Sequence, residues 1–297
     1  MHIVEKPKLN VSAEELFVLC VKSYLDEDYK KRLLGYSDRV RRHAAASEKQ
    51  VPFNIHAYLQ EVLPEQVSEE EMEKVYKDKL RGGKNQRDYY EAIRKNTPDG
   101  KCLICGVDTA NSLDHYLPKS RVPTLAVDPG NLIPVCSECN GKKGDKLWID
   151  PCDMPIHNYY DEIPEGKWLH VRLGAHLEAE YYVSCPKEWD QLLRIRLGKH
   201  LHTYQLYEKY STDTIVQISE LKAAWKVEKK LLQKKKAGNA TIQEMKEALQ
   251  ELIMKRCMEK EELDENSCAA AYYRGLEANM DLVYQFFGLK EAIGVDK

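Results

Sequence analysis

The sequence lacks the features that mark membrane and secreted proteins. No apolar run approaches the roughly 18 residues that a membrane-spanning helix needs. The opening residues, from Met1 to Pro7, contain neither the basic region nor the apolar core of a signal peptide. We therefore expect a soluble cytoplasmic protein, in a compartment whose reducing conditions keep cysteines from forming disulfides.

The chain also lacks an excess of positive charge. Its 297 residues carry a formal net charge of −3, with 31% charged and 43% hydrophobic residues, which suits a soluble chain of one large or two modest domains. It contains no recognisable helix-turn-helix, second zinc finger, internal repeat or low-complexity tract. A stand-alone protein that grips nucleic acid usually carries a basic excess. If nucleic acid is the substrate, positive charge must be concentrated locally or a partner must share the contact.

Four of the nine cysteines form two Cys-x-x-Cys pairs, Cys102 with Cys105 and Cys136 with Cys139. A two-residue spacer lets both sulfurs of a pair face one ion, and two such pairs complete a tetrahedral zinc site. The alternatives are four unrelated thiols or two disulfides, and a reducing compartment disfavours disulfides. Because cysteine fills all four positions, the predicted Zn²⁺ is structural. The other five cysteines lack ligand spacing and are expected to be small core residues.

The 30 residues between the pairs, 106–135, are too many for a plain zinc ribbon, so a further structure must fold there. Residues 113–118 alternate apolar and polar side chains and predict a short strand that ends at Pro118. Residues 131–135 predict the returning strand, and residues 136–144 predict a knuckle that leads into a short helix. The expected order is strand, loop, strand, helix, with zinc joining the ends.

Polar residues in this segment suit metal-assisted hydrolysis. The carboxylate of Asp114 can hold a hard cation such as Mg²⁺. The adjacent imidazole of His115 titrates near neutrality and can take a proton from water. Asn140, on the predicted helix, offers an amide oxygen as a second hard ligand. Each residue alone has an ordinary reading as a surface, cap or turn residue, and only their order inside the zinc segment makes the pattern informative.

With Asn131 between them, these residues resemble the HNH endonuclease family, which has the ββα-metal fold. The resemblance implies that His115 is the general base, that Asp114 binds the catalytic metal, that Asn131 braces the loop and orients the base, and that Asn140 is a metal ligand. The third motif position is Asn here instead of His, a variant familiar among active members. An amide oxygen is a hard ligand, so this variant favours Mg²⁺ or Mn²⁺.

Four further residues are candidate substrate contacts. Three are lysines close to the motif, and the fourth is a histidine in the stretch from His157 to Asp161, which weakly resembles a His-x-Tyr-Tyr-Asp stretch after the core of some bacterial HNH proteins. A histidine at such a position is more often packed in the core. The four are Lys119, Lys142, Lys143 and His157.

The fold class expected for the whole chain is α+β and mostly helical, with a small zinc-stapled ββα-metal nuclease core. Ser12 to Glu15 and Thr241 to Glu244 are capping-box patterns that predict helix starts. Residues 168–184 predict a β-hairpin. Helices are also expected at 51–63, 68–80, 187–210, 214–236 and from about 265 to 287. The expected domains are a helical N-terminal region at 1–95, the HNH core with its following hairpin at 96–185, and a C-terminal helical region at 186–297.

Two basic stretches of the sequence each allow two interpretations. Residues 30–43 contain six Lys or Arg side chains with a histidine, and residues 222–236 hold seven lysines against one glutamate. Each stretch is either a solvated helix face or a contact for phosphates.

These observations predict two alternative functions of different classes. The first is a metal-dependent HNH endonuclease acting on DNA or, less favoured, on RNA such as tRNA. The second is a zinc-stabilised binding module without catalysis, which would tolerate loss of His115, Asp114 or Asn140; the presence of all three favours the enzyme. The Lys-Pro N-terminus and helical flanks also resemble the HNH subunit of Septu-type antiphage systems, some of them attached to retrons. That resemblance implies an ATPase partner and, in a retron, a reverse transcriptase with its DNA.

Overall fold

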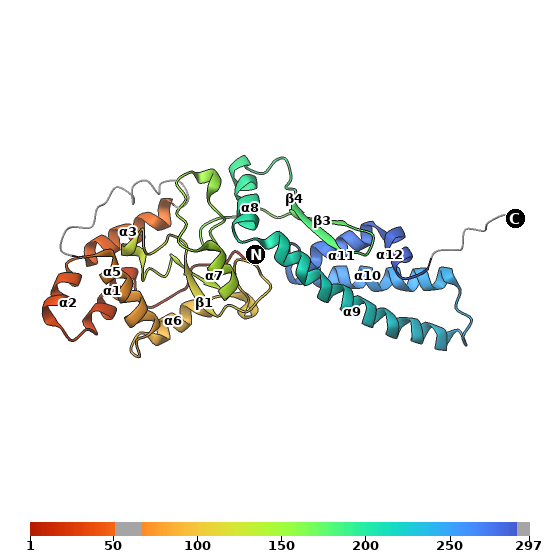
Figure 1. Ribbon diagram of the computed structural model, residues 1–297, viewed down its shortest axis with the longest axis horizontal. Coiled ribbons are helices and arrows are strands. Elements are labelled where there is room, and N and C mark those ends of the chain that lie inside the picture. Colours follow the sequence, from red (N-terminus) through yellow and green to blue (C-terminus); the bar gives the residue numbers. More distant parts are fainter. Residues whose placement is uncertain (51–66, 290–297) are drawn as a thin grey trace. The chain divides into compact units, whose positions relative to one another are not determined.

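The structure of the protein, a computed structural model, describes residues 1–50 and 67–289. The chain divides into two compact units, and each unit contains helices and one two-stranded sheet (Figure 1). The first unit comprises Met1–Pro164 and Asp190–Tyr204, and the second comprises Glu165–Trp189 and Gln205–Lys297. The expected α+β, mostly helical class is confirmed.

The helices that begin the first unit share a hydrophobic core with its sheet. The predicted capping box is present: the Ser12 side chain accepts from the backbone N–H of Glu15, whose carboxylate accepts from the backbone N–H of Ser12. Leu16 and Phe17 are buried in the same cluster as Leu113 of the sheet. These helical elements are α1 (Ala13–Lys22), α2 (Glu27–Leu34), α3 (Ser37–Gln50), α5 (Glu69–Lys74), the π-helical turn η1 (Val75–Arg81) and α6 (Arg87–Arg94).

The zinc-motif segment folds in the predicted order of strand, loop, strand and helix. Strand β1 (Ser112–His115) pairs antiparallel with β2 (Leu132–Val135), and helix α7 (Ser137–Lys143) follows. This register places Asp114 opposite Ile133 and His115 opposite Leu132, at the end of the ladder. The remaining elements of the unit are the single turns η2 (Pro98–Gly100), η3 (Pro123–Leu125) and η4 (Pro151–Asp153), and helix α8 (Gln191–Thr203).

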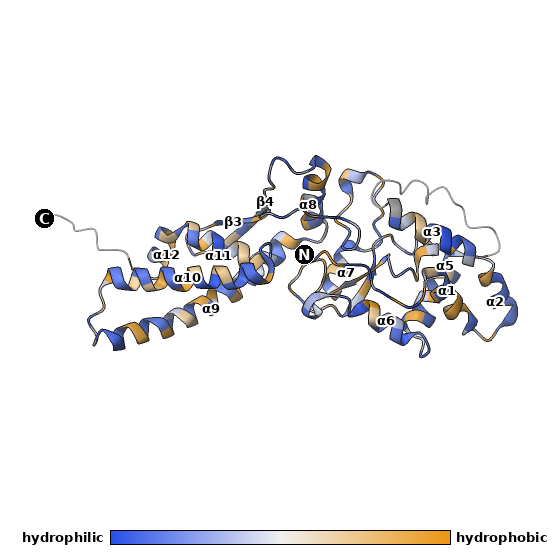
Figure 2. Ribbon diagram, turned by 180° about the vertical axis from the view of Figure 1, so that it is seen from behind, coloured by the Kyte–Doolittle hydropathy of each residue, from blue (hydrophilic) through white to orange (hydrophobic). Residues whose placement is uncertain are grey.

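The second unit packs three long or medium helices and one short helix around a hairpin. Strand β3 (Leu169–Leu173) pairs antiparallel with β4 (Ala179–Val183), as expected from the alternating sequence. The helices are α9 (Leu206–Lys235), α10 (Ile242–Asp264), α11 (Cys268–Ala278) and α12 (Met280–Phe286). Figure 2 shows hydrophobic and hydrophilic residues alternating along α9 and α10, which is the pattern of helices with one buried side.

The hairpin does not belong with the HNH core, so the expected 96–185 region is divided between the two units. The reason lies in its contacts: β3 packs against α11 and β4 against α9. The buried hydroxyl of Tyr181 lies 3.0 Å from the Thr214 hydroxyl of α9 and donates to the Cys268 carbonyl at 3.1 Å. Conversely, α8, expected in the C-terminal region, belongs to the first unit.

Three expected helices are shorter or broken. The helix expected at 187–210 is interrupted at Gln205, whose φ of 53° ends α8 and starts α9. The helix expected up to residue 287 breaks at Asn279 between α11 and α12. The helix expected at 68–80 turns π-helical in its second half. The helix expected at 51–63 lies outside the described residues. Within 1–50 and 67–289, no helix is both long and apolar enough to cross a membrane.

The basic stretch at 30–43 is largely neutralised by neighbouring carboxylates. This favours the reading of a solvated helix face, because paired cations offer less charge to a phosphate. The ion pairs are Lys30 with Glu27, Arg32 with Glu71, and Arg41 and Arg42 with Asp38. In the second stretch, Lys236 pairs with Glu244, and Lys222 lies 4.9 Å from the Phe286 ring centroid.

The loop that leads into β2 depends on a glycine. A Cβ on Gly130 would lie 2.1 Å from the hydroxyl oxygen of Tyr160. We therefore expect Gly130→Ala to lower the free energy of unfolding by about 2 kcal/mol, and Tyr160→Phe in the same chain to recover most of that loss because it removes the colliding oxygen. Urea unfolding measures both. Gly141→Ala is the control, because nothing lies within 4 Å of its Cβ position. An equal loss at Gly141, or no recovery in the double variant, would contradict this explanation.

Candidate active site

The four motif cysteines converge at one place in the first unit. Their sulfur atoms all lie within 4.8 Å of one another, and all four residues are buried. Cys136 is the N-cap of α7, and its sulfur accepts from the backbone N–H of Cys139 at 3.4 Å. Gly106, directly after the first pair, has a φ of 70°, which an L side chain rarely adopts, so the tight turn after Cys105 depends on glycine.

This cluster fits a zinc ion by its donor set and spacing. Tetrahedral Zn–S bonds of about 2.3 Å place sulfur atoms roughly 3.8 Å apart, which lies within the observed limit. No disulfide is present among the described cysteines.

His115 is held as a neutral ring in a defined tautomer. Its Nε2 lies 2.9 Å from the carbonyl oxygen of Ala126. A carbonyl oxygen can only accept, so Nε2 carries the hydrogen and Nδ1 keeps a lone pair. Burial lowers the pKa of His115 to about 3, and Tyr76 packs edge-on against the ring with centroids 4.4 Å apart. The geometry therefore leaves Nδ1 as the nitrogen that can accept a proton.

Asp114 lies beside a buried ammonium. The Nζ of Lys143 is 3.2 Å from its Oδ1 and also donates to the His115 carbonyl at 2.5 Å. Burial raises the pKa of the Asp114 carboxyl, and the charge of Lys143 opposes that rise. A buried carboxylate costs much free energy unless a cation faces it, and the ammonium of Lys143 offsets part of that cost.

The two asparagines occupy different structural settings. Asn131 is buried and holds the loop: its Oδ1 accepts from the backbone N–H of Leu117 at 2.7 Å, and its Nδ2 donates to the carbonyls of Leu117 and Leu125 at 2.9 and 3.2 Å. Asn140 is half-buried on α7, and its Nδ2 lies 3.3 Å from the Ser112 hydroxyl oxygen. That contact joins the side chain to β1.

Asp114, His115 and Asn140 line one pocket of about 300 Å³, together with Lys119 and Lys143. The motif residues are therefore brought together as expected. The pocket also contains residues that sequence reasoning missed, because η1 reaches it from the N-terminal helices and no motif spacing signals that approach. These additional lining residues include Tyr76, Lys77 and Arg81.

The four candidate substrate contacts lie in different surroundings. Lys119 is half-buried at the pocket, and Lys142 is exposed on α7 but does not line it. Lys143 is buried with Asp114, which places its ammonium inside the site and not on an open surface. His157 is fully enclosed by Tyr116 and Tyr160, and its Nδ1 accepts from the backbone N–H of Tyr159 at 3.1 Å. His157 is thus packed in the core, which is the commoner alternative for such a histidine, and it does not line the pocket of His115.

Known proteins are similar to the segment that carries these pocket residues. Residues 101–146 match the family model for HNH endonuclease, so this segment is an HNH endonuclease domain. The chain is 30% identical over 157 residues to protein ea31 of Escherichia phage lambda, covering 50% of this chain and 53% of that protein. It is 34% identical over 80 residues to Septu protein PtuB of Bacillus thuringiensis, covering 25% of this chain and 29% of that protein. The chain thus spans about half or less of these curated relatives. No solved structure matches it.

The cysteine cluster gives a prediction about zinc content and stability. Cys136→Ser removes one of four sulfur ligands, so we expect loss of bound zinc and a lower melting temperature, because structural zinc contributes directly to folding. Elemental analysis and thermal unfolding measure the two effects. Cys152→Ser, an exposed cysteine outside the cluster, is the control and should change neither. Fresh, unchelated wild-type protein that contains no zinc would rule out the assignment.

The buried ion pair between Asp114 and Lys143 gives a further prediction. Lys143→Met leaves Asp114 as an unpaired buried charge, so the free energy of unfolding should fall by about 3 kcal/mol. Adding Asp114→Asn removes that charge and should recover part of the loss. The control is Lys142→Met, the exposed neighbour on the same helix. Denaturant titrations compare the four chains, and equal effects of Lys142 and Lys143 would show that the pair does not stabilise the fold.

Proposed function

We propose that the protein is a metal-dependent endonuclease that hydrolyses phosphodiester bonds in nucleic acid. The observation that carries the proposal is the His115 ring, whose Nε2 is committed to the Ala126 carbonyl while Nδ1 keeps its lone pair, in the same pocket as Asp114 and Asn140. The HNH family match over residues 101–146 supports it independently.

The chain's own residues divide the chemistry as follows. His115 takes a proton from the attacking water at Nδ1, which its neutral state permits. Asn131 holds the loop of Leu117 and Leu125 and so keeps the neighbouring Ala126 carbonyl in place as the acceptor that orients the ring. The positive charges of Lys119 and Arg81 lie at the pocket, where they suit a phosphate anion.

The donor set at the pocket fits a hard divalent ion, because Asp114 offers a carboxylate oxygen and Asn140 an amide oxygen. These two residues would hold Mg²⁺ or Mn²⁺, which supplies polarisation of the phosphate and stabilisation of the leaving oxyanion. The four cysteines hold Zn²⁺ in a structural role.

The biological setting we propose is antiphage defence in the cytoplasm. Its support is the similarity to Septu protein PtuB, over about a quarter of this chain. An ATPase partner that controls cleavage, and a retron reverse transcriptase with its DNA in a retron-attached system, belong to this proposal. DNA is the favoured substrate, with RNA such as tRNA as the other candidate, because the catalytic groups act on the phosphodiester and not on the sugar. A module that binds without cleaving remains the second candidate, and the His115 test separates the two.

The test uses purified full-length protein with plasmid DNA, single-stranded DNA and total tRNA, with and without added Mg²⁺ or Mn²⁺. We expect metal-dependent cleavage of one substrate and a loss of at least about 100-fold in His115→Ala, because it removes the general base. Gel or capillary electrophoresis follows the products.

His202→Ala is the matched control, since His202 is an exposed histidine of the same unit that does not line the pocket. Cleavage that survives in His115→Ala would show that another group is the base. If the wild type cleaves none of the substrates even with a co-purified partner present, the binding module is the better description.

A further inference from the structure

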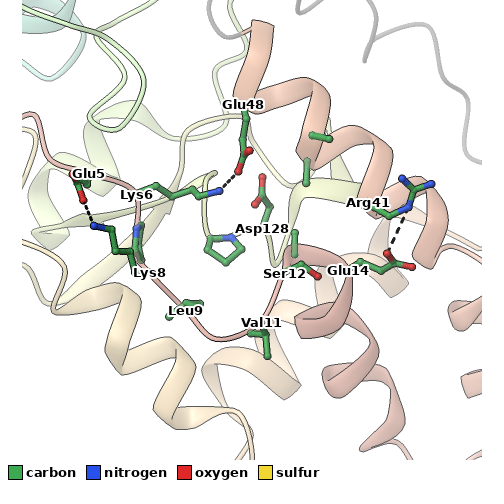
Figure 3. A pocket seen from close by; sticks show the side chains of 15 residues that line it. Glu5, Lys6, Lys8, Leu9, Val11, Ser12, Glu14, Arg41, Glu48 and Asp128 are labelled. Carbon is green, nitrogen blue, oxygen red and sulfur yellow. Dashed lines mark ion pairs between the residues drawn. The ribbon is translucent and has the colours of Figure 1, made fainter.

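A second pocket in the first unit, of about 700 Å³, lies between the N-terminal segment, α1, α3 and the loop before β2 (Figure 3). Its volume falls within the range typical of small-ligand sites. It shares no lining residue with the pocket of His115. The HNH match, which covers residues 101–146, assigns it no role.

The charges of this pocket do not balance. Three cationic side chains line it, and each is already paired with a lining glutamate. The fourth carboxylate, Asp128, is left over: its Oδ1 accepts from the backbone N–H of Gly130 at 3.0 Å, and its Oδ2 has no hydrogen-bond partner among the described residues. The existing pairs, drawn as dashed lines in Figure 3, are Lys6 with Glu48, Lys8 with Glu5, and Arg41 with Glu14.

Asp128 is a buried residue in the wall of this pocket. The residue is only 3% exposed, yet its carboxylate lines the cavity and stands among the labelled side chains of Figure 3. Burial raises the pKa of Asp128 to about 6. A buried carboxylate oxygen without a partner is costly, and a cation that donates a hydrogen bond would relieve the cost.

The apolar residues that line the pocket indicate which kind of cation fits it. Leu9, Val11, Ala44 and Pro129 provide apolar surface in the same pocket. A bare metal ion would gain nothing from these groups, whereas an aliphatic stem that ends in a charged nitrogen would use both features.

We propose that this pocket binds an alkylguanidinium or alkylammonium group, with its charged nitrogen on Asp128 and its stem against the apolar wall. Such a group is found on free polyamines and related small amines and on arginine or lysine side chains of another protein. The site does not depend on the endonuclease activity proposed above.

The pocket lies behind the loop that positions the candidate general base. The Asp128 carbonyl accepts from the backbone N–H of Asn131 at 3.0 Å, and its N–H donates to the Leu125 carbonyl at 3.3 Å. Two residues before Asp128, the Ala126 carbonyl accepts from His115. A cation held by Asp128 therefore restrains the same short loop that orients His115.

Calorimetric titration of the full-length protein tests binding with two probes. Agmatine presents an alkylguanidinium with no peptide backbone, and a blocked glycine-arginine-glycine peptide presents it as a side chain. We expect saturable 1:1 binding of at least one probe. Tighter binding of the peptide by tenfold or more identifies a protein side chain as the source, and equal or tighter binding of agmatine identifies a small amine. The same peptide with uncharged citrulline in place of arginine should bind at least tenfold more weakly.

Variants locate the site. Asp128→Asn keeps the shape of the side chain and should weaken binding at least tenfold. Glu5→Gln makes the same charge change in an exposed, already paired lining residue and should alter affinity less than twofold. Ala45→Phe, at an exposed lining position of α3, should obstruct the pocket while leaving Asp128 intact, which covers the case in which Asp128→Asn misfolds.

Hydrogen exchange of the 126–131 loop provides a readout that does not require cleavage. Saturating probe should slow exchange there in the wild type and not in Ala45→Phe. The proposal is overturned if neither probe binds saturably, if Asp128→Asn binds as tightly as the wild type, if Glu5→Gln weakens binding as much as Asp128→Asn does, or if the loop's exchange is unchanged by bound probe.

Discussion

The convergence of the four cysteines is the constraint on which the candidate active site depends. Cys102 and Cys105 lie before β1, whereas Cys136 and Cys139 begin α7, so a single ion bound by all four would close the whole ββα segment into a ring. The two strands are only four residues each, and an isolated two-stranded hairpin is marginally stable in water. Packing against the N-terminal helices supplies rigidity that such a small sheet lacks, and closure of the ring by an ion would add to it.

That rigidity lets the site keep polar groups largely buried at the wall of the pocket. Asp114, His115, Asn131 and Lys143 are all buried, and each has a defined partner. The imidazole of His115 is neutral, whereas the carboxyl of the adjacent Asp114 lies beside the ammonium of Lys143. Burial alone disfavours both charged forms, and the position of Lys143 next to Asp114 is what distinguishes the two.

The loop from Leu125 to Asn131 connects two features of the first unit. On one side, the Ala126 carbonyl accepts from His115, and Asn131 holds the loop to Leu117 and Leu125. The other side carries Asp128, which faces a separate cavity with an unmatched negative charge. A loop that is held by side-chain and turn hydrogen bonds, and not by a sheet ladder, is a place where binding on one side can change geometry on the other.

The sequence by itself determined the chemistry and the local order of the core. The Cys-x-x-Cys spacing, the Asp-His pair and the two asparagines sufficed to predict the zinc cluster, strands β1 and β2, helix α7 and a common pocket for Asp114, His115 and Asn140, because these are short-range patterns that a ββα unit requires. Only the tertiary structure decided which residues complete the pocket and which merely lie near it in sequence. Tyr76 and Arg81 reach the pocket from a π-helical turn more than 30 residues upstream, while His157 turns into an aromatic core and Lys143 pairs inward with Asp114. The unmatched charge of Asp128 is likewise a tertiary feature, because the other charged residues of its pocket pair with one another. Such contacts depend on packing between distant segments, and neither composition nor periodicity encodes that packing locally.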